Sequence, residues 1–348
     1  MKRIAALVAV VLATTTLVAC GSDDSPSGGA SARAGKVVLV TYSGYELPKD
    51  AAKAFTEETG TKIEVLATDD AGAALGRAIL AAGDPEGDLF FGVDTTFLTQ
   101  ATGSDAFERS TPAIRDLPEA VLDPSGTLVP IDESTVCVNV DRTWFEAKGV
   151  APPTTFEDLV DPRYKGLLVT EDPATSSPGL VFLAATVQQM GDRAPDYWAR
   201  LRDNGVEVAG GWSDAYFSSF TVNGGDRPLV VSYASSPPAE VMGSDAARAT
   251  PKSTVMTSTC TRQVEFAGIL RGAKNRKGAE RLLAAMQSED WQAALPASNY
   301  VFPVRPGVRL PEAFERFAVR PADPIQLDPE QVGRHRDEWL DRWRDVMG

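Results

Sequence analysis

The sequence predicts an α/β protein with two lobes, each built on a mixed sheet flanked by helices. Residues 36–94 alternate between strand and helix, in the order that is typical of parallel strands joined by right-handed crossovers. A second alternating region extends from residue 167 to residue 236. Two long segments rich in β-branched residues, 127–145 and 257–270, flank this second region and suit strands that cross between lobes as hinges. The predicted lobes comprise residues 36–135 with 262–348, and residues 136–261.

In the first region, apolar strands and amphipathic helices follow each other closely. The predicted strands are 36–42, 61–67 and 87–94, and the predicted helices are 48–60 and 71–83, each ended by a glycine. In sheets of this kind a ligand lies beyond the C-terminal ends of the strands. Polar side chains occupy or follow these ends: Thr41, Tyr42, Ser43, Asp69, Asp70 and Asp94.

The second region and the C-terminal part carry similar signals. Two lobes leave a cleft between them, and such clefts are favoured places for a small ligand. The predicted strands are 167–173, 206–211 and 228–236, and the predicted helices are 177–191, 196–205, 213–224, 277–288, 289–296 and 329–347.

The N-terminus has the features of an export signal. Lys2 and Arg3 precede an apolar stretch that is too short for a lasting membrane span. It ends in Leu-Val-Ala-Cys at residues 17–20, which resembles the bacterial lipoprotein signal; an ordinary cleaved signal peptide is the alternative. The tract that follows is rich in Gly, Ser and Asp and suits a flexible tether. We expect a signal peptide at 1–19, lipidation of Cys20, a tether at 20–35 and a location at the outer face of the cell membrane.

Composition narrows the class of partner. The 348 residues carry a net charge of −14, which argues against nucleic acid because phosphate binding needs a basic face. An acidic surface is compatible with a cationic ligand. His335 is the single histidine, and with three cysteines spread along the chain no metal site is expected. Cys137 and Cys260 lie in strand-like segments, and this local pattern leaves two free thiols and a disulfide equally open.

A Ser-Ser-Pro sequence occurs twice, at residues 176–178 and 235–237, each time after an apolar strand. Serine at the N-cap and proline in the first turn are typical of helix starts. A helix that starts at the C-terminal edge of a sheet directs free backbone N–H groups into the cleft, where they suit an anionic or strongly hydrogen-bonding group. Capping alone is the alternative interpretation.

Aromatic residues fall at matching places, where they could stack on a planar ring or a delocalised cation. Asp70 could pair with an amine-bearing or positively charged group. For each ring taken singly, a place in the core is the alternative. The aromatic residues concerned are Tyr42, Trp212, Tyr216, Tyr233, Tyr300 and Phe302.

Catalytic motifs are missing from the sequence. It contains no G-x-S-x-G, no G-x-x-x-x-G-K-[ST] and no G-x-G-x-x-G after the first strand. One remote histidine makes a Ser-His-Asp triad implausible. The pair Asp69–Asp70 could serve a glycosidase, but acidic pairs are common in a chain with 48 acidic residues. We therefore predict binding without turnover and without a cofactor.

From Val37 to Met347 the chain resembles the thiamine-binding proteins of bacterial thiamine ABC transporters, which have the type II periplasmic binding-protein fold. The resemblance rests on VTYSGY, DLFFGVD, EDPATSSPGL, GGWSDAY, VVSYASSP, NYVFPV and VGRHRDEWLDRW, which occur in the family's order. It implies a monomeric lipoprotein that captures thiamine or thiamine phosphates between its lobes. The lobes would close on the ligand, which the protein would deliver to a membrane permease with its ATPase.

The resemblance also implies a set of ligand-binding residues. Tyr42 would contact the ligand rings, Asp70 the aminopyrimidine, and the turn at Ser176 an oxygen or phosphate of the ligand. The full set carried over is Tyr42, Asp70, Ser176, Gly179, Trp212, Tyr233, Ser236 and Tyr300.

Three departures from the family pattern bear on the ligand. Tyr300 stands where the familiar members have tryptophan, Ala239 stands where they have tyrosine, and residues 131–140 lack the usual aromatic run. In such folds the crossing strands run side by side, which implies a disulfide between Cys137 and Cys260. The alternatives are a carrier of polyamine, ferric iron or another cation, and a thiamine-degrading enzyme that uses a free cysteine.

Overall fold

The structure is a computed structural model that describes residues 35–114, 117–243 and 249–348. The expected signal peptide at 1–19, Cys20 and all of the tether except Gly35 lie outside the described residues. Within the described part of the chain, no helix has the length and apolar character needed to cross a bilayer.

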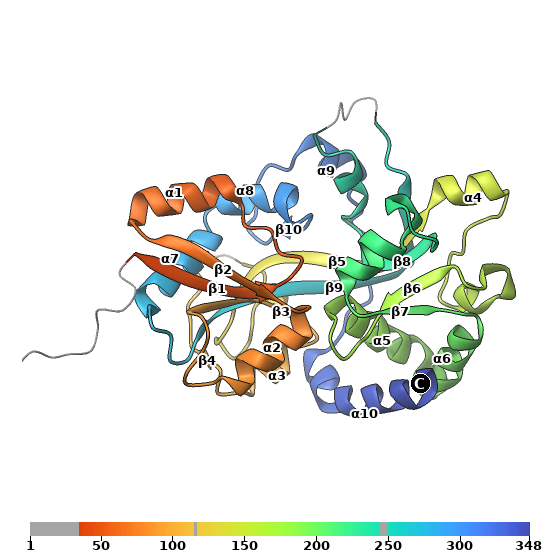
Figure 1. Ribbon diagram of the computed structural model, residues 1–348, viewed down its shortest axis with the longest axis horizontal. Coiled ribbons are helices and arrows are strands. Elements are labelled where there is room, and N and C mark those ends of the chain that lie inside the picture. Colours follow the sequence, from red (N-terminus) through yellow and green to blue (C-terminus); the bar gives the residue numbers. More distant parts are fainter. Residues whose placement is uncertain (1–34, 115–116, 244–248) are drawn as a thin grey trace, which may run out of the picture. The chain divides into compact units, whose positions relative to one another are not determined.

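One continuous sheet of ten strands runs through the described residues (Figure 1). Its main path is β2-β1-β3-β9-β5-β8-β6-β7, with β4 paired to β9 and β10 paired to β5. The predicted α/β architecture is confirmed, but the two expected sheets are joined into one because the crossing strands pair with each other. The strands are β1 (Lys36–Tyr42), β2 (Lys62–Thr68), β3 (Leu89–Asp94), β4 (Phe107–Glu108), β5 (Val129–Asp141), β6 (Leu168–Glu171), β7 (Glu207–Ala209), β8 (Leu229–Tyr233), β9 (Ser253–Leu270) and β10 (Phe302–Pro303).

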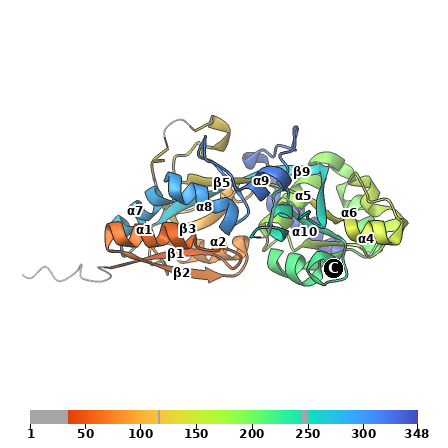
Figure 2. The same ribbon diagram turned by 90° about the horizontal axis from the view of Figure 1, so that it is seen from above.

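The first lobe packs helices on both faces of the parallel strands β1, β2 and β3. Alternate residues of a strand point to opposite faces. Leu39 and Phe91 therefore meet α1 (Lys49–Thr59), α7 (Arg276–Met286) and α8 (Glu289–Ser298). Val40 and Phe90 on the other face belong to the same core as α2 (Ala71–Leu80). This arrangement brings the C-terminal end of β1 to the edge of the lobe that faces the second lobe (Figure 2).

The second lobe is built on β6, which lies parallel to β7 and β8. Its helices are α4 (Arg142–Lys148), α5 (Ser177–Met190) and α6 (Ala194–Asp203), and α5 is buried along most of its length. Two further short helices, α3 (Leu98–Thr102) and α9 (Glu312–Phe317), lie outside this lobe's sequence. Several 3-10 turns connect the elements: Glu119–Val121, Glu157–Val160, Pro162–Tyr164, Gly191–Arg193, Thr221–Asn223 and Pro237–Glu240.

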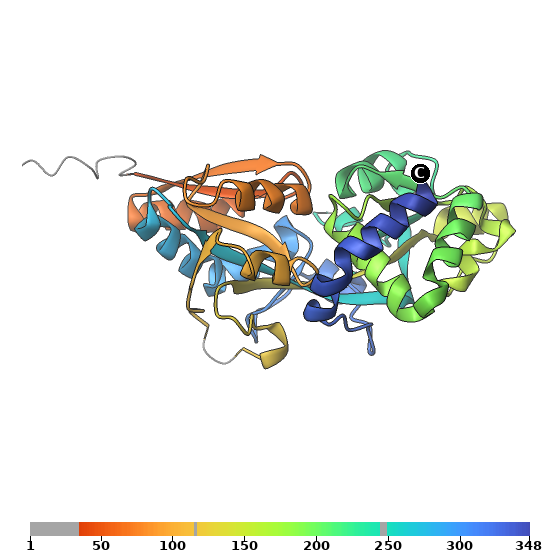
Figure 3. The same ribbon diagram turned by 90° about the horizontal axis from the view of Figure 1, so that it is seen from below.

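The closing helix α10 (Pro329–Met347) contacts both lobes (Figure 3). Near its start, Thr99 of α3 donates a hydrogen bond to the carbonyl of Pro329. Near its end, Trp343 packs edge-to-face on Trp198 of α6, with 5.5 Å between ring centroids. The sequence placed residues 262–348 in the first lobe alone, and the packing of α10 differs from that expectation.

Two predicted helices of the second lobe are shorter and less regular than expected. Residues 213–224 form a π-helical stretch, Asp214–Ser219, followed by a 3-10 turn. After the second Ser-Ser-Pro sequence the chain makes only the 3-10 turn Pro237–Glu240. The carboxylate of Glu240 then accepts a hydrogen bond from the amide of Lys252, which ties the end of this turn to the start of β9.

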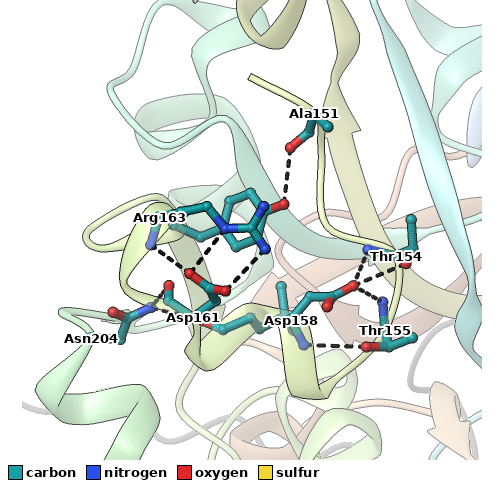
Figure 4. Close-up of polar contacts among 9 residues, drawn as sticks. Ala151, Thr154, Thr155, Asp158, Asp161, Arg163 and Asn204 are labelled. Atoms are coloured by element: carbon teal, nitrogen blue, oxygen red, sulfur yellow. Dashed lines mark hydrogen bonds and ion pairs between the residues drawn. The ribbon is translucent and has the colours of Figure 1, made fainter. Parts of the chain in front are cut away.

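Short-range polar contacts fix the connection between α4 and β6 (Figure 4). Thr155 and Asp158 form a capping box, in which each side chain accepts the other's backbone N–H. The backbone N–H of Thr154 also donates to Asp158, and these bonds lower the pKa of its carboxyl group. Asp161 forms an ion pair with Arg163, and the side chain of Asn204 donates to the Asp161 carbonyl. This part of the second lobe is therefore held independently of any ligand.

The crossing strands β5 and β9 are antiparallel and paired from Val129–Ala267 to Asp141–Ser253. Their register shifts twice, between Pro130 and Asp132 and between Val136 and Val138. A disulfide joins Cys137 to Cys260 at the second shift, and both residues are 1% exposed. Bulges bend a strand locally, so these shifts are the natural places for the two lobes to hinge.

Candidate ligand-binding site

A cavity of about 450 Å³ lies between the lobes. Its volume is within the range of small-molecule sites, roughly 300–1,000 Å³. Strand ends from both lobes reach it, β1 through Tyr42 and β8 through Tyr233. Of the eight ligand-binding residues predicted from the sequence, these six line it: Tyr42, Asp70, Trp212, Tyr233, Ser236 and Tyr300.

An aromatic wall, formed by Trp212, Tyr216, Phe217 and Tyr233, covers the second-lobe side of the cavity. Trp212 stacks on Tyr216, with ring centroids 5.0 Å apart and an interplanar angle of 16°. The indole N–H of Trp212 donates to the Ser232 hydroxyl over 2.9 Å, which fixes the orientation of the ring. Phe217 lies in the lining and is 55% exposed, so its ring is accessible to a ligand in the cavity.

Tyr300 faces the cavity from the first lobe in a strained backbone conformation. Its φ is +56°, and among the described residues it is the single non-glycine residue with positive φ. Such a conformation is an outlier for a bulky residue and recurs at functional sites. The neighbouring Asn299 holds the turn in place, because its side chain bonds both the N–H and the carbonyl of Glu46.

Asp70 connects the two lobes through its carboxylate. One oxygen accepts the N–H of Ala71 over 2.7 Å and so caps α2, and the other accepts the N–H of Trp212 over 2.8 Å. A Cβ at Gly211 would lie 2.7 Å from the Asp70 carboxylate, so this approach needs glycine. Burial raises the pKa of Asp70, and the N–H groups of Trp212 and Ala71 oppose that shift.

The first Ser-Ser-Pro sequence differs from its predicted role. Ser176 is buried outside the lining, whereas Ser177 reaches the cavity and donates to the carboxylate of Asp94. Gly179 packs against the backbone of Glu171, and a Cβ on Gly179 would lie 2.6 Å from the Glu171 carbonyl oxygen. The sequence predicted that an anionic part of the ligand would lie at the start of α5. In the structure the carboxylate of Asp94 lies there instead, hydrogen-bonded to Ser177.

At the second Ser-Ser-Pro sequence, the serine hydroxyl that reaches the cavity is also hydrogen-bonded to the protein itself. Ser236 lines the cavity, but its hydroxyl lies 3.0 Å from that of Ser232 and accepts the N–H of Tyr233 over 3.3 Å. The following 3-10 turn has only four residues and two prolines. Few free N–H groups therefore point at a ligand from this position.

Sequence reasoning missed three of the four carboxylates in the lining. Glu46, Glu240 and Glu265 join Asp70, and no lysine, arginine or histidine is among the described residues that line the cavity. The signal for Glu265 is its place in the apolar run Val264–Leu270 of β9, because an acidic residue is rarely buried in such a run without a partner. Burial, together with the charge of Asp94, raises the pKa of Glu265 to about 8.

The chemistry of this lining suits a cation. Aromatic faces and carboxylates both attract positive charge, more strongly in a desolvated site than in water. No group of three or more His, Cys, Asp or Glu side chains within the described residues is arranged to hold a metal ion.

A cavity between two lobes, lined by aromatic and acidic side chains, is typical of proteins that bind a small solute. Residues 84–321 match the family model of the bacterial extracellular solute-binding proteins, and the chain belongs to this family. Members of the family serve in solute transport, which is not an enzymatic activity.

Relatives of this chain include named thiamine-binding periplasmic proteins. That of Salmonella typhimurium is 30% identical over 296 residues, which cover 84% of this chain and 86% of the relative. That of Brucella suis is 29% identical, with 83% and 84% covered. The resemblance predicted from the sequence is confirmed.

Solved structures give the same fold. A periplasmic thiamin binding protein superposes with a TM-score of 0.80 at 26% identity, covering 92% of this chain and all of the other. A ferric binding protein from Campylobacter jejuni reaches 0.71 at 17% identity, covering 89% and 99%. At 17% identity, the similarity to the ferric binding protein shows only that the two proteins share a fold.

Proposed function

We propose that this protein captures thiamine in the cavity between its lobes and delivers it to an ABC permease. The observation that carries the proposal is the lining itself, in which the aromatic wall stands opposite tyrosines and beside four carboxylates. Thiamine contains a permanently charged thiazolium ring and a flat aminopyrimidine ring. Both ring systems suit stacking against Trp212 and its neighbours, and the fixed charge suits the carboxylates.

The same lining favours thiamine over its phosphate esters. A phosphate brings negative charge into a cavity whose lining carries Glu46, Asp70, Glu240 and Glu265. Like charges at short range are repulsive, and phosphate sites normally contain Arg, Lys or free helix N-termini. Asp94 already occupies the start of α5 through Ser177.

Closure of the lobes is the proposed mechanism of capture. Contacts that cross between the lobes include the Trp212 N–H to Asp70 and the N–H of Gly72 to the Thr175 carbonyl, 2.9 Å. A ligand that touches both lobes shifts the equilibrium toward this arrangement. The hinge lies at the register shifts of β5 and β9.

The cellular context is part of the same proposal. Cys20 would carry the lipid anchor, and the tether would hold a monomeric binding protein near its permease at the outer face of the cell membrane. The Leu-Val-Ala-Cys sequence and the Gly/Ser/Asp tract support this assignment.

The disulfide weighs against a thiamine-degrading enzyme. Such an enzyme would need a nucleophilic thiolate in the cavity. Cys137 and Cys260 are bonded to each other, and neither is among the lining residues.

A thermal-shift panel tests the proposal against its rivals. A solute that binds the native state raises the unfolding temperature in proportion to the logarithm of its concentration over Kd. We expect thiamine to raise it most, thiamine monophosphate less, and spermidine and ferric citrate little. A larger shift with spermidine would identify a polyamine carrier instead.

A further inference from the structure

Asp132 and Glu265 form a buried carboxyl pair at the hinge side of the cavity. Asp132 of β5 and Glu265 of β9 are directly opposite in the register of the two crossing strands. The two residues are 1% and 5% exposed. Glu265 belongs to the cavity lining, whereas Asp132 does not. Two adjacent carboxyl groups removed from water cannot both ionise without a large cost, so such pairs retain a proton.

The surroundings do not neutralise the carboxyl pair. The phenol of Tyr42 on β1 donates to Glu265 over 3.3 Å. Within the described residues, no N–H or hydroxyl group donates to either carboxyl oxygen of Asp132, and the carboxyl group of Glu265 is the side chain that can share a proton with it. Next to Asp132 on β5, Glu133 forms ion pairs with Arg262 and Arg320, at N···O distances of 3.0 and 3.1 Å. The other titratable groups that act on the pair are acidic or phenolic: Asp94 of β3, Asp70 at the start of α2, Tyr45, and Tyr233 of β8.

These surroundings raise the pKa values of both carboxyl groups of the pair in the ligand-free protein. Burial first, and then the charge of Asp94, raise the pKa of Glu265 to about 8. Burial and the charge of Glu265 raise the pKa of Asp132 well above its usual range. At neutral pH the empty carboxyl pair therefore holds at least one proton.

We propose that capture of a cationic solute expels one proton from the carboxyl pair into the solvent, and that capture therefore strengthens as pH rises. The inference rests on the proposed function, because it needs a ligand with a fixed positive charge. The O–H bond of the pair breaks, the proton goes to water and buffer, and the resulting carboxylate of Glu265 faces the bound cation. Glu265 thereby becomes a specificity-determining residue that no sequence motif had indicated.

The sign and size of the effect follow from linkage. Above about pH 8 the carboxyl group of Glu265 is already ionised while Asp132 keeps its proton, and affinity is at its maximum. Below that pH, ligand binding must remove the proton, so affinity falls by about tenfold for each pH unit. Net proton release should approach one per ligand near neutral pH and vanish above the pKa.

Calorimetric titration of the protein with thiamine tests this inference. Titrations at the same pH in two buffers of different ionisation enthalpy give the number of protons released. We expect close to one proton per thiamine near neutral pH, and an affinity that rises from about pH 6.5 to about pH 8. Binding with no proton release and a flat pH profile would overturn the inference while leaving the proposed function intact.

Two variants identify which carboxyl group releases the proton. Glu265→Gln keeps the size and hydrogen-bonding capacity of the side chain but cannot ionise, and Asp132→Asn does the same on the other strand. We expect Glu265→Gln to bind thiamine more weakly than the wild type at high pH, with proton release close to zero. Asp132→Asn should still release a proton near neutral pH, because burial and Asp94 keep the pKa of Glu265 raised. Glu58→Gln, exposed on α1, is the matched control and should release protons as the wild type does. Full proton release by Glu265→Gln would place the proton elsewhere and overturn the assignment.

A second probe separates failure of the ligand from failure of the mechanism. If thiamine gives no heat at any pH, spermidine is titrated in the same way. Proton-linked binding of spermidine would support the carboxyl pair and reject thiamine. Absence of binding by either cation would reject both the inference and the proposed function.

Discussion

The backbone N–H of Trp212 donates a 2.8 Å hydrogen bond to the carboxylate of Asp70. The two residues belong to different lobes, and Asp70 also caps α2 through the N–H of Ala71. One carboxylate therefore ends a helix of the first lobe and positions the largest ring of the cavity in the second. This contact ties lobe closure to assembly of the aromatic wall.

Two substitutions at Asp70 measure its structural and electrostatic roles. Asp70→Asn offers one acceptor oxygen to the two N–H groups of Ala71 and Trp212, so it should lose one hydrogen bond and lower the free energy of unfolding by about 1 kcal/mol. Asp70→Ala loses both bonds and should cost about 2 kcal/mol. We expect both to weaken thiamine binding, because both remove the charge beside the cavity. Urea unfolding and calorimetry measure the two effects, and unchanged affinity in both variants would contradict this role.

Trp212 is expected to be the main stacking surface for the ligand. Trp212→Ala should weaken thiamine binding by about tenfold or more, since a desolvated cation–π contact is worth about 2 kcal/mol. Trp212→Phe keeps an aromatic face and should lose less. Trp339→Phe on α10, outside the cavity lining, is the control. An affinity equal to the wild type in Trp212→Ala would remove the aromatic wall from the binding site.

Gly179 is predicted to act in packing, in contrast to its expected contact with ligand. A Cβ there would lie 2.6 Å from a backbone oxygen, so Gly179→Ala should lower the free energy of unfolding by about 1–3 kcal/mol. Gly76→Ala is the matched control, because nothing lies within 4 Å of a Cβ on that residue of α2. Alanine there should stabilise by up to about 1 kcal/mol. Equal unfolding midpoints for the two variants would contradict the packing role.

The disulfide is expected to contribute stability without contacting the ligand. It closes a loop of 123 residues in sequence separation, and removing such a link costs about 2–5 kcal/mol. The double variant Cys137→Ser, Cys260→Ser should unfold at lower urea concentration and still bind thiamine one-to-one. Reduction of the wild type should give the same unfolding curve. Reactive thiols at both Cys137 and Cys260 in the unfolded, non-reduced protein would show that the bond is not formed.

Local patterns explain how much of the fold was predictable. The apolar run at Lys36–Tyr42 and the left-handed glycine at Gly60 mark element ends directly. The capping box at Thr155–Asp158 has the T-x-x-D pattern and could have been found in the same way. No local pattern shows that the two sheets merge into one, because this depends on pairing between strands more than a hundred residues apart; only the family resemblance implied that the crossing strands run side by side.

The site was predictable where a residue ends a strand and less so elsewhere. Tyr42 and Tyr233 line the cavity because each lies at the C-terminal edge of the parallel strands of its own lobe, and these two edges face each other. Ser176 and Gly179 do not, since the start of α5 turns toward Asp94 and the Glu171 backbone. The neighbours of Glu265 in sequence mark it as a buried acid, but its pairing with Asp132 arises from the register of β5 and β9 and could not be predicted locally.

The proposed function is best tested by calorimetric titration of the protein with thiamine, followed by chemical analysis of the recovered ligand. We predict one thiamine bound per chain, with the vitamin recovered intact and thiamine monophosphate bound at least about tenfold more weakly. Tighter binding of the phosphate ester would contradict the acidic-lining argument. No binding of thiamine, or its cleavage during the titration, would contradict the proposed function.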